Sequence, residues 1–362
     1  MTEGMDRKPT ITDVARLANV SIKTVSRVIN GERYVTEDMQ TRVRKAVAEL
    51  GFHPNLSARS LAGDRSFLIA HLYGDPSGTY TSDIQAGLLN RCREHGYHLL
   101  IEEIDYSSPD IEQRSSTLLH QLRLDGVVLT APVTDNEIVQ RVLERARIPH
   151  VRITPQRESD ASPSVRIDER EAAVKLTQHL LSLGHRRIGF IKGSPNHAAT
   201  ELRYSGFCTA MEEAGVEIES DLLEKGRFTY ASAVPCARRL LARDDRPTAI
   251  FASNDEMAAA VIAVAVEQGL TLPRDLSIVG FDDTPMAQML SPALTTVRHP
   301  VREMGEAAAD ILFAAFAQRG QAASTSPAPH RVLPYEIILR QSTSVAPAQA
   351  AAAKKAATKK AR

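Results

Sequence analysis

From Phe67 onward the chain alternates short apolar runs with amphipathic stretches, and this alternation limits the folds open to it more than any other feature. The short runs are rich in Val, Ile and Leu and predict strands. The longer stretches between them carry apolar residues three and four apart and predict helices. Strands and helices in alternation form βαβ units, in which the strands are parallel. The pattern therefore predicts an α/β core with parallel sheets.

The alternation occurs twice. The predicted strands of the first series read FLIAHLY, HLLIEEI, GVVLT and HVRI, and those of the second read SVRID, RIGFIKG, TAIFASN and LSIVGFDD. One more helix, MGEAAADILFAAFAQ, and one more strand, HRVLPYEIILR, follow near the C-terminus. These late elements can complete both sheets, so we expect two lobes with the chain crossing between them more than once. A cleft between lobes joined in this way is a common place for a ligand.

The stretch 10–66 has a different pattern, which is typical of a helix-turn-helix unit. Thr10 can cap a first helix, and Asp13, three residues on, can reach back to the cap. Asn19 suits a tight turn, because Asn tolerates left-handed backbone geometry. Ser21 then caps a second helix. The sequence thus predicts two short helices joined by a tight turn.

The second helix of this unit has one apolar and one basic face. Its inward positions are Val25, Val28 and Ile29. Lys23 and Arg27 are four residues apart and share the other face. A third helix is expected from Thr36, closed by Gly51, and a short helical piece, NLSARSLAG, follows Pro54. This order is the layout of a DNA reader with a minor-groove hinge.

Charge is distributed unevenly, although the formal net charge is zero. Residues 1–66 carry 11 Lys and Arg against 8 Asp and Glu, and residues 67–344 carry 28 against 36. The last stretch, 345–362, has five basic side chains and no acidic one. Basic ends around an acidic centre indicate that only the ends meet a polyanion. The Ala/Lys-rich tail cannot bury a core, so we expect it to be disordered.

Several classes of protein are disfavoured. The three cysteines, Cys92, Cys208 and Cys236, have no metal-ligand spacing, and we expect free thiols, no metal and no cofactor. There is no phosphate-binding loop, no nucleophile elbow and no zinc-protease motif, so we expect no enzyme and no catalytic residue. No apolar run has a signal peptide's pattern or approaches about 18 residues, which favours a cytoplasmic protein without a membrane partner.

The motifs taken together resemble the Lac repressor and Gal repressor family of bacterial transcription regulators. The resemblance runs from about Thr10 to Arg340, over nine-tenths of the chain. It rests on an ordered series: VSIKTVSRVIN, PNLSARSL, LGHRRI, SND and GFDD. The family implies a helix-turn-helix and hinge helix followed by a two-lobed core like that of periplasmic binding proteins. It also implies a homodimer that binds a near-palindromic double-stranded DNA operator.

The resemblance implies which residues meet DNA. Ile22, Lys23 and Arg27 occupy base-reading positions, and the hydroxyl residues Ser21, Thr24 and Ser26 resemble those that contact phosphates. Leu61 resembles the leucine that wedges between central base steps in the minor groove. The remaining DNA-binding candidates are Asn30 and, on the hinge helix, Asn55, Ala58 and Arg59. Arg27 can bond a guanine edge in two places, and Ile22 would favour a thymine methyl.

The resemblance also implies an effector site for a sugar or another small metabolite. Arg203, Asn254, Asp255 and Asp282 occupy its effector-binding positions. Asp75 and Tyr80, in the loop after the first strand, and Phe228, which can stack on a flat ligand, are further candidates. Carboxylates accept hydrogen bonds from sugar hydroxyls while Arg and Asn donate back. Helix capping or loop support is the alternative role for Asp255 and Asp283, and a structural role is expected for His185.

The expected domain boundaries follow. A helix-turn-helix DNA-binding domain spans 1–53, a hinge helix 54–66, an effector-binding and dimerisation core 67–344, and a disordered tail 345–362. Within the core, the first lobe takes about 67–166 and 298–328, and the second about 167–297 and 329–342. The function we expect is a sequence-specific regulator, a repressor of carbohydrate-use genes whose operator affinity changes when an effector binds. The alternatives are a soluble sugar receptor and a sugar-metabolising enzyme with an appended DNA module.

Overall fold

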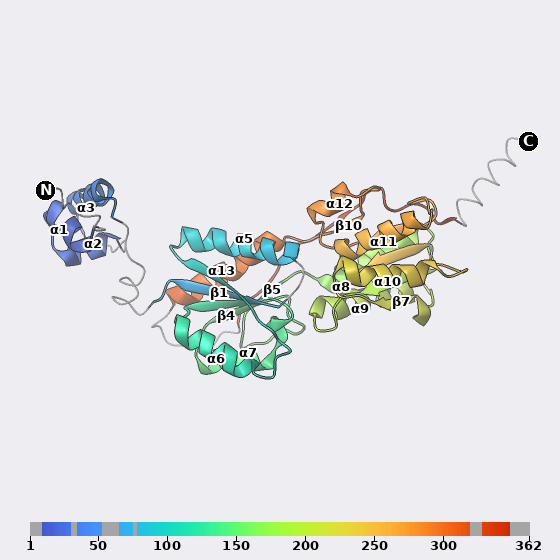
Figure 1. The fold of residues 1–362 in the computed structure, drawn as a ribbon, viewed down its shortest axis with the longest axis horizontal. Helices are drawn as coiled ribbons and strands as arrows, with labels where there is room; N and C mark the ends of the chain where they lie inside the picture. Colours follow the sequence, from blue (N-terminus) through green and yellow to red (C-terminus); the bar gives the residue numbers. More distant parts are fainter. Residues whose placement is uncertain (1–8, 30–34, 53–64, 75–77, 319–327, 348–362) are drawn as a thin grey trace, which may run out of the picture. The chain divides into compact units, whose positions relative to one another are not determined.

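The computed structural model describes residues 9–29, 35–52, 65–74, 78–318 and 328–347. The chain divides into two units, Met1–Phe67 and Leu68–Arg362 (Figure 1). The first unit is helical, and the second holds the strands. This division agrees with the prediction of an all-α N-terminal region followed by an α/β core.

The N-terminal unit contains three described helices, α1 (Ile11–Leu17), α2 (Ile22–Ile29) and α3 (Glu37–Leu50). The predicted ends are confirmed. The Thr10 backbone N–H donates to Oδ2 of Asp13 (2.9 Å), and the Thr24 N–H donates to Oγ of Ser21 (3.1 Å). Asn19 has a φ of 50°, as the tight turn requires, and Gly51 closes α3 with a φ of 60°.

Apolar residues from all three helices form the core of this unit. Val25 of α2 is fully buried, as its inward position predicts. The other buried members are Val14, Ala15, Ala18, Val43, Ala46 and Phe52. Arg42 of α3 donates to the carbonyl of Ala18 (3.3 Å), which satisfies a carbonyl group at the end of α1. The core thus fixes α2 against its neighbours and leaves its other face outward.

The first lobe of the second unit is built on a six-stranded sheet. Its strands run in the order β11-β5-β4-β3-β1-β2, and the described pairings are parallel. The strands are β1 (Leu68–Tyr73), β2 (His98–Glu103), β3 (Gly126–Leu129), β4 (His150–Ile153), β5 (Ser164–Arg166) and β11 (His330–Val332). β3 and β4 are buried along their whole length, which agrees with their continuous apolar runs.

Helices cover both faces of this sheet (Figure 1). α5 (Gly78–Glu94) and α13 (Val301–Ala317) lie on one face, and α6 (Ile111–Leu122) and α7 (Glu137–Arg145) on the other. A short 3₁₀ helix, η1 (Val133–Asp135), precedes α7. α5 and α13 pack closely because two glycines at their contact have no Cβ. A Cβ at Gly87 would lie 2.0 Å from the Arg302 carbonyl oxygen, and a Cβ at Gly305 would lie 2.4 Å from the Ile84 carbonyl oxygen.

The second lobe has a four-stranded sheet in the order β7-β6-β8-β9, with parallel pairings. Its strands are β6 (Ile188–Lys192), β7 (Leu223–Lys225), β8 (Ala249–Ala252) and β9 (Ser277–Val279). Its helices are α8 (Glu169–Ser182), α9 (Ala198–Glu213), η2 (Ser220–Leu222), α10 (Tyr230–Leu241), α11 (Asp255–Glu267) and α12 (Pro285–Met289). Phe190 and Phe251 pack against Phe207 of α9 on one face, and α10 and α11 share a core with Ile191 and Ile250 on the other.

The C-terminal segment differs from the prediction in the number and the place of its strands. We predicted one strand over HRVLPYEIILR in the second lobe, but the segment forms two. β11 pairs with β5 in the first-lobe sheet, and β12 (Glu336–Ile338) pairs antiparallel with β10 (Thr296–Arg298). Pro334 separates them and cannot donate a ladder hydrogen bond.

The tail begins later than predicted. The backbone N–H of Ala346, which we placed in the disordered tail, donates to the carbonyl of Leu183 (2.9 Å), and Ala346 is buried. The remainder, 348–362, lies outside the described residues. Across the described ranges, no helix is both long enough and apolar enough to cross a membrane.

Candidate functional site

The outward face of α2 carries the predicted DNA-reading side chains. Ile22 is 49% exposed and Lys23 is exposed, while Val25 one turn on is buried. At the start of the helix the hydroxyls of Ser21 and Thr24 lie 2.9 Å apart. Donor hydroxyls beside a helix N-terminus suit a phosphate oxygen, because the helix dipole favours an anion there. This surface therefore combines a group for base edges with groups for the backbone.

The other predicted DNA contacts are partly described. Ser26 and Arg27 follow on α2 and are half-buried. The remaining candidates, Asn30, Asn55, Ala58, Arg59 and Leu61, lie outside the described residues. Their roles stay predictions from the resemblance.

A pocket in the second unit is lined by residues of both lobes. The first lobe contributes Tyr80, Ala131 and Thr154, and the second contributes Glu169, His197, Ala199, Arg203, Phe228, Asn254 and Asp282. Most of these residues follow the carboxyl end of a strand. Asn254, for example, comes two residues after β8, and Asp282 three after β9. Ligands bind at this edge in open α/β sheets, where connections to the helices leave polar groups uncovered.

Five of the seven predicted effector residues meet in this pocket: Tyr80, Arg203, Phe228, Asn254 and Asp282. One placement is corrected, because Tyr80 lies in the first turn of α5 and not in a loop. Asp75 lies outside the described residues. The seventh residue, Asp255, is absent from the lining.

Arg203 is the electrostatic centre of the pocket. Its side chain is 4% exposed, and its Nε donates to Oε2 of Glu169 at 2.8 Å. Its Nη2 lies 3.5 Å from Oδ1 of Asp282, its Nη1 donates to the Ser253 carbonyl, and its guanidinium carbon lies 3.6 Å from the Phe281 ring centroid. Burial alone would lower the pKa of the guanidinium, but the carboxylates of Glu169 and Asp282 outweigh it and raise that pKa.

Asp282 of the second lobe is connected to the first lobe by contacts with His299. Nε2 of His299 lies 3.2 Å from Oδ1 of Asp282, and the His299 ring stacks on Tyr80 with centroids 5.8 Å apart. His299 directly follows β10 in one of the crossovers between the lobes. Asp282 therefore contacts a binding-site cation and a crossover residue that touches the first lobe.

The adjacent Asp283 points elsewhere, as expected for neighbouring residues at a strand end. It accepts from Nε of Arg298 (2.7 Å) and lies 2.6 Å from Nη2 of Arg340. Arg298 is the last residue of β10, and Arg340 follows the end of β12 by two residues. Asp283 thus supports the crossovers, which agrees with the loop-support alternative, and it is not a partner of Asp282 in a catalytic pair.

Asn254 and Phe228 fix each other at the pocket wall. Nδ2 of Asn254 donates to the Phe228 carbonyl (2.9 Å), and its Oδ1 accepts from the N–H of Met257 (2.9 Å), capping α11. Phe228 has a φ of 62°, and a Cβ at Gly193 would lie 2.0 Å from its ring. Glycine at 193 is therefore required for the aromatic ring to occupy this wall.

Asp255 supports the pocket from behind. Its Oδ1 accepts from Oγ1 of Thr296 (2.6 Å), and its Oδ2 accepts from the backbone N–H of Thr284 (2.7 Å). The side chain is fully buried, so the prediction that it contacts the effector is corrected to loop support. Burial, followed by the charge of nearby Asp282, raises the pKa of Asp255 to about 8.

Asp255→Asn is expected to remove a pH dependence of stability. A folded-state pKa raised above the ordinary value near 4 means that Asp255 favours folding when protonated. The wild type should lose stability as pH rises from about 4 through about 8, at up to about 1.4 kcal/mol per pH unit. The neutral amide should flatten this slope in urea unfolding followed by circular dichroism. Asp244→Asn, at an exposed position, should retain it; a wild-type slope in Asp255→Asn would contradict the assignment.

Sequence reasoning missed five lining residues: Ala131, Thr154, Glu169, His197 and Ala199. The first three follow β3, β4 and β5. A search at the ends of the predicted strands would have found Ala131 and Thr154. Glu169 was hidden because an acidic residue at the start of a helix usually serves the helix dipole. The predicted structural role of His185 is confirmed, since its ring nitrogens contact Thr248 and Ser277.

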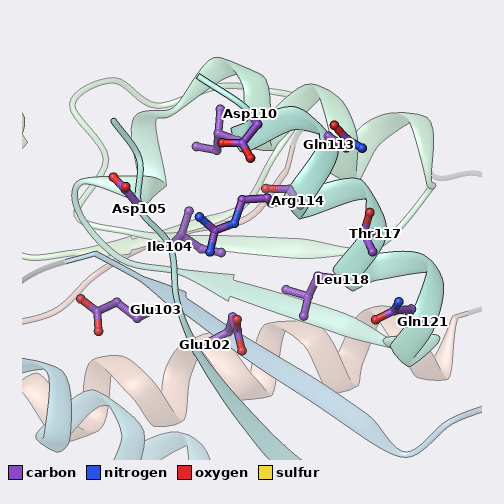
Figure 2. Close-up of a pocket in the computed structure, with 12 residues that line it drawn as sticks. Glu102, Glu103, Ile104, Asp105, Asp110, Gln113, Arg114, Thr117, Leu118 and Gln121 are labelled. Carbon is purple, nitrogen blue, oxygen red and sulfur yellow. The ribbon is translucent and has the colours of Figure 1, made fainter. Parts of the chain in front are cut away.

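A second hollow lies between the end of β2 and α6 (Figure 2). Its lining includes four acidic residues, Glu102, Glu103, Asp105 and Asp110, and one basic residue, Arg114, whose side chain extends from α6 into the hollow. Hydrogen bonds from Ser107, and more weakly the charge of Arg114, lower the pKa of Asp105. This acidic surface would repel a phosphate backbone, and no predicted site residue lines it. Within the described parts of the chain, no group of three or more His, Cys, Asp and Glu could hold a metal ion.

Comparison with known proteins identifies a DNA-binding region at the N-terminus and a ligand-binding-like region after it. A family model described as "Bacterial regulatory proteins, lacI family" matches residues 10–55, and one described as "Periplasmic binding protein-like domain" matches residues 177–343. The HTH-type transcriptional regulator DegA of Bacillus subtilis is 37% identical over 345 residues, which cover 93% of this chain and 98% of DegA.

Two solved structures of similar proteins show what the fold accommodates. The transcriptional regulator CelR–cellobiose complex has a TM-score of 0.70 and 30% identity, covering 92% of this chain and 99% of CelR. The Lac repressor dimer bound to operator and the anti-inducer ONPF has a TM-score of 0.77 and 26% identity, covering 93% of this chain and all of that one. The architecture therefore matches along nearly the whole chain.

Proposed function

The chain belongs to the lacI family of bacterial regulatory proteins and is a DNA-binding transcriptional regulator, and we propose that it represses carbohydrate-use genes until a sugar-like effector occupies the pocket around Arg203. In this proposal it acts in the cytoplasm as a homodimer on a near-palindromic operator. The solved Lac repressor, a dimer bound to operator, supports the dimer and its DNA partner. Its relatives are transcriptional regulators and repressors. Like them, it is a regulator and not an enzyme.

One observation carries this proposal. The same chain has both parts of such a regulator. Its N-terminal unit presents Ile22 and Lys23 outward on α2. Its second unit contains a pocket whose buried polar groups come from two lobes. CelR is solved in complex with cellobiose, which supports a saccharide as the ligand of this chain. Buried donors and acceptors select a ligand strongly, because a molecule that leaves them unpaired loses affinity.

The proposed mechanism is a shift between two conformations. An effector that contacts both lobes favours one arrangement of them over the other. If that arrangement fits the operator less well, binding of effector lowers operator affinity by a coupling free energy on the order of 1–3 kcal/mol. The contact of Asp282 with His299, and of His299 with Tyr80, lies on the path from the pocket to a crossover. This makes Asp282 a candidate for transmitting ligand occupancy.

The test is selection of DNA by the full-length protein from sheared genomic DNA of its own bacterium. We expect enrichment of a few near-palindromic fragments over random duplex of equal length. The enriched fragments are then bound again in the presence of each sugar of a panel, and one sugar should lower affinity by about tenfold or more. Equal binding to every fragment, with every sugar, would reject the proposed function. Turnover of any sugar into a product would reject it in favour of an enzyme.

A further inference from the structure

The charges around the pocket are unusual for a site that binds an anion. Glu169 and Asp282 are carboxylates, and Arg203 is the one basic side chain among the described lining residues other than His197. Burial, followed by the charge of Arg203, lowers the pKa of His197 to about 4, so its ring is neutral near pH 7. The lining therefore holds two carboxylates and one cation.

Arg203 already forms ion pairs with both carboxylates. Glu169 is 1% exposed and forms a 2.8 Å hydrogen bond with Nε, while Asp282 lies 3.5 Å from Nη2. The Ser253 carbonyl accepts from Nη1, and the Phe281 ring covers a face of the guanidinium. A carboxylate or phosphate on a ligand would add a third negative charge beside a single guanidinium that already pairs with two carboxylates. A buried charge without a cation of its own is strongly unfavourable.

Among the described residues that line the pocket, there is no Lys and no Arg other than Arg203. The nearest lysine along β6, Lys192, does not line the pocket; it lies 3.4 Å from the Tyr204 ring centroid and 3.8 Å from Glu201. Asp255, directly behind, adds no positive charge either.

We infer, on the basis of the proposed function, that the effector is an uncharged polyhydroxyl compound and that Glu169 is the residue that excludes phosphorylated and carboxylated sugars. Hydroxyl groups can donate to the remaining lone pairs of Asp282 and Glu169, and they can accept from the amide of Asn254. The Phe228 ring offers an apolar face for the C–H surface of a sugar ring. A neutral ligand thus pairs with the lining without breaking the Arg203–Glu169 ion pair.

The experiment measures binding to the full-length wild type by thermal shift and calorimetry, without DNA. The probes are neutral saccharides and matched anions: glucose with glucose 6-phosphate and glucuronate, ribose with ribose 5-phosphate, and cellobiose. We expect at least one neutral member to raise the melting temperature and to bind at least tenfold more tightly than its anionic counterpart. Stabilisation by no neutral member, or tighter binding of an anion, would overturn the inference.

Glu169→Gln tests the residue itself. The amide keeps the shape of Glu169 but removes its charge, so Arg203 gains freedom to pair with an anion. We expect the phosphate or carboxylate counterpart to gain at least tenfold in affinity, with the neutral sugar changing less. Glu171→Gln, the same change at an exposed position two residues on, should alter neither affinity. No gain for any anion in Glu169→Gln, with the fold intact by circular dichroism, would remove Glu169 from this role.

These measurements separate this inference from the proposed function. If an anionic sugar binds and changes operator affinity, the regulator stands and the charge rule fails. If a neutral sugar binds but no DNA fragment is preferred, the charge rule stands and the regulator fails. Each conclusion therefore has its own result.

Discussion

Arg27→Ala is expected to abolish discrimination between the operator and random DNA while leaving effector binding unchanged. A bidentate arginine contact with guanine contributes about 1–3 kcal/mol of base discrimination. A dimer on a near-palindrome makes that contact twice, so the loss should be about 2–6 kcal/mol, or at least about thirtyfold in operator affinity. Affinity for random duplex should fall little, because it depends on many phosphate contacts.

Fluorescence anisotropy with operator and random duplexes, at one fixed salt concentration, measures both affinities. Arg44→Ala removes the same charge from an exposed position on α3, where Arg44 contacts Gln40. We expect this control to weaken both duplexes by a similar small factor. Undiminished operator preference in Arg27→Ala would refute the assignment of α2 as the base-reading helix.

The second large effect is expected from Arg203→Met, which should destabilise the second unit and eliminate the effector response. The change leaves Glu169, 1% exposed, and Asp282, 12% exposed, close together without the cation that pairs with both. Breaking a buried pair from one side typically costs about 3–5 kcal/mol. Methionine fills a comparable volume, so a cavity contributes little to the loss.

Urea unfolding of the full chain, followed by circular dichroism, measures this cost. Arg238→Met breaks the ion pair with Glu267, in which both side chains are more than half exposed, and should change stability by no more than about 1 kcal/mol. The double variant Arg203→Met with Glu169→Gln should regain part of the stability but none of the response. If Arg203→Met unfolds like the control, the ion pair is not the support that its geometry indicates.

Regular elements with strong patterns could be predicted from the sequence. The predicted strands GVVLT and TAIFASN correspond to β3 and β8. Both are buried along their whole length, which suits continuous apolar runs in the interior of a parallel sheet. Elements without such a pattern were missed. β7, with the residues LEK, is a short edge strand whose pairing is decided by β6, and α12 has only five residues.

The site was predicted where chemistry and position coincide. Arg203, Asn254 and Asp282 were named from the family resemblance, and all three line the pocket. Asp255 shows the limit of that reasoning: it lies next to Asn254, yet its carboxylate points to Thr284 and Thr296 and not to the pocket. Side-chain direction depends on φ and on the neighbouring loop, neither of which the sequence displays. The partner of Arg203 in the ion pair, Glu169, is 34 residues away in the sequence and could not be identified by spacing.

The central claim is that the pocket around Arg203 and the DNA-reading unit are thermodynamically coupled. The most direct measurement is a reciprocal one: operator affinity with and without saturating effector, and effector affinity with and without saturating operator. Linkage requires the two factors to be equal, and we expect both to be about tenfold or more. An effector that binds with the same affinity whether or not the operator is present would contradict the claim.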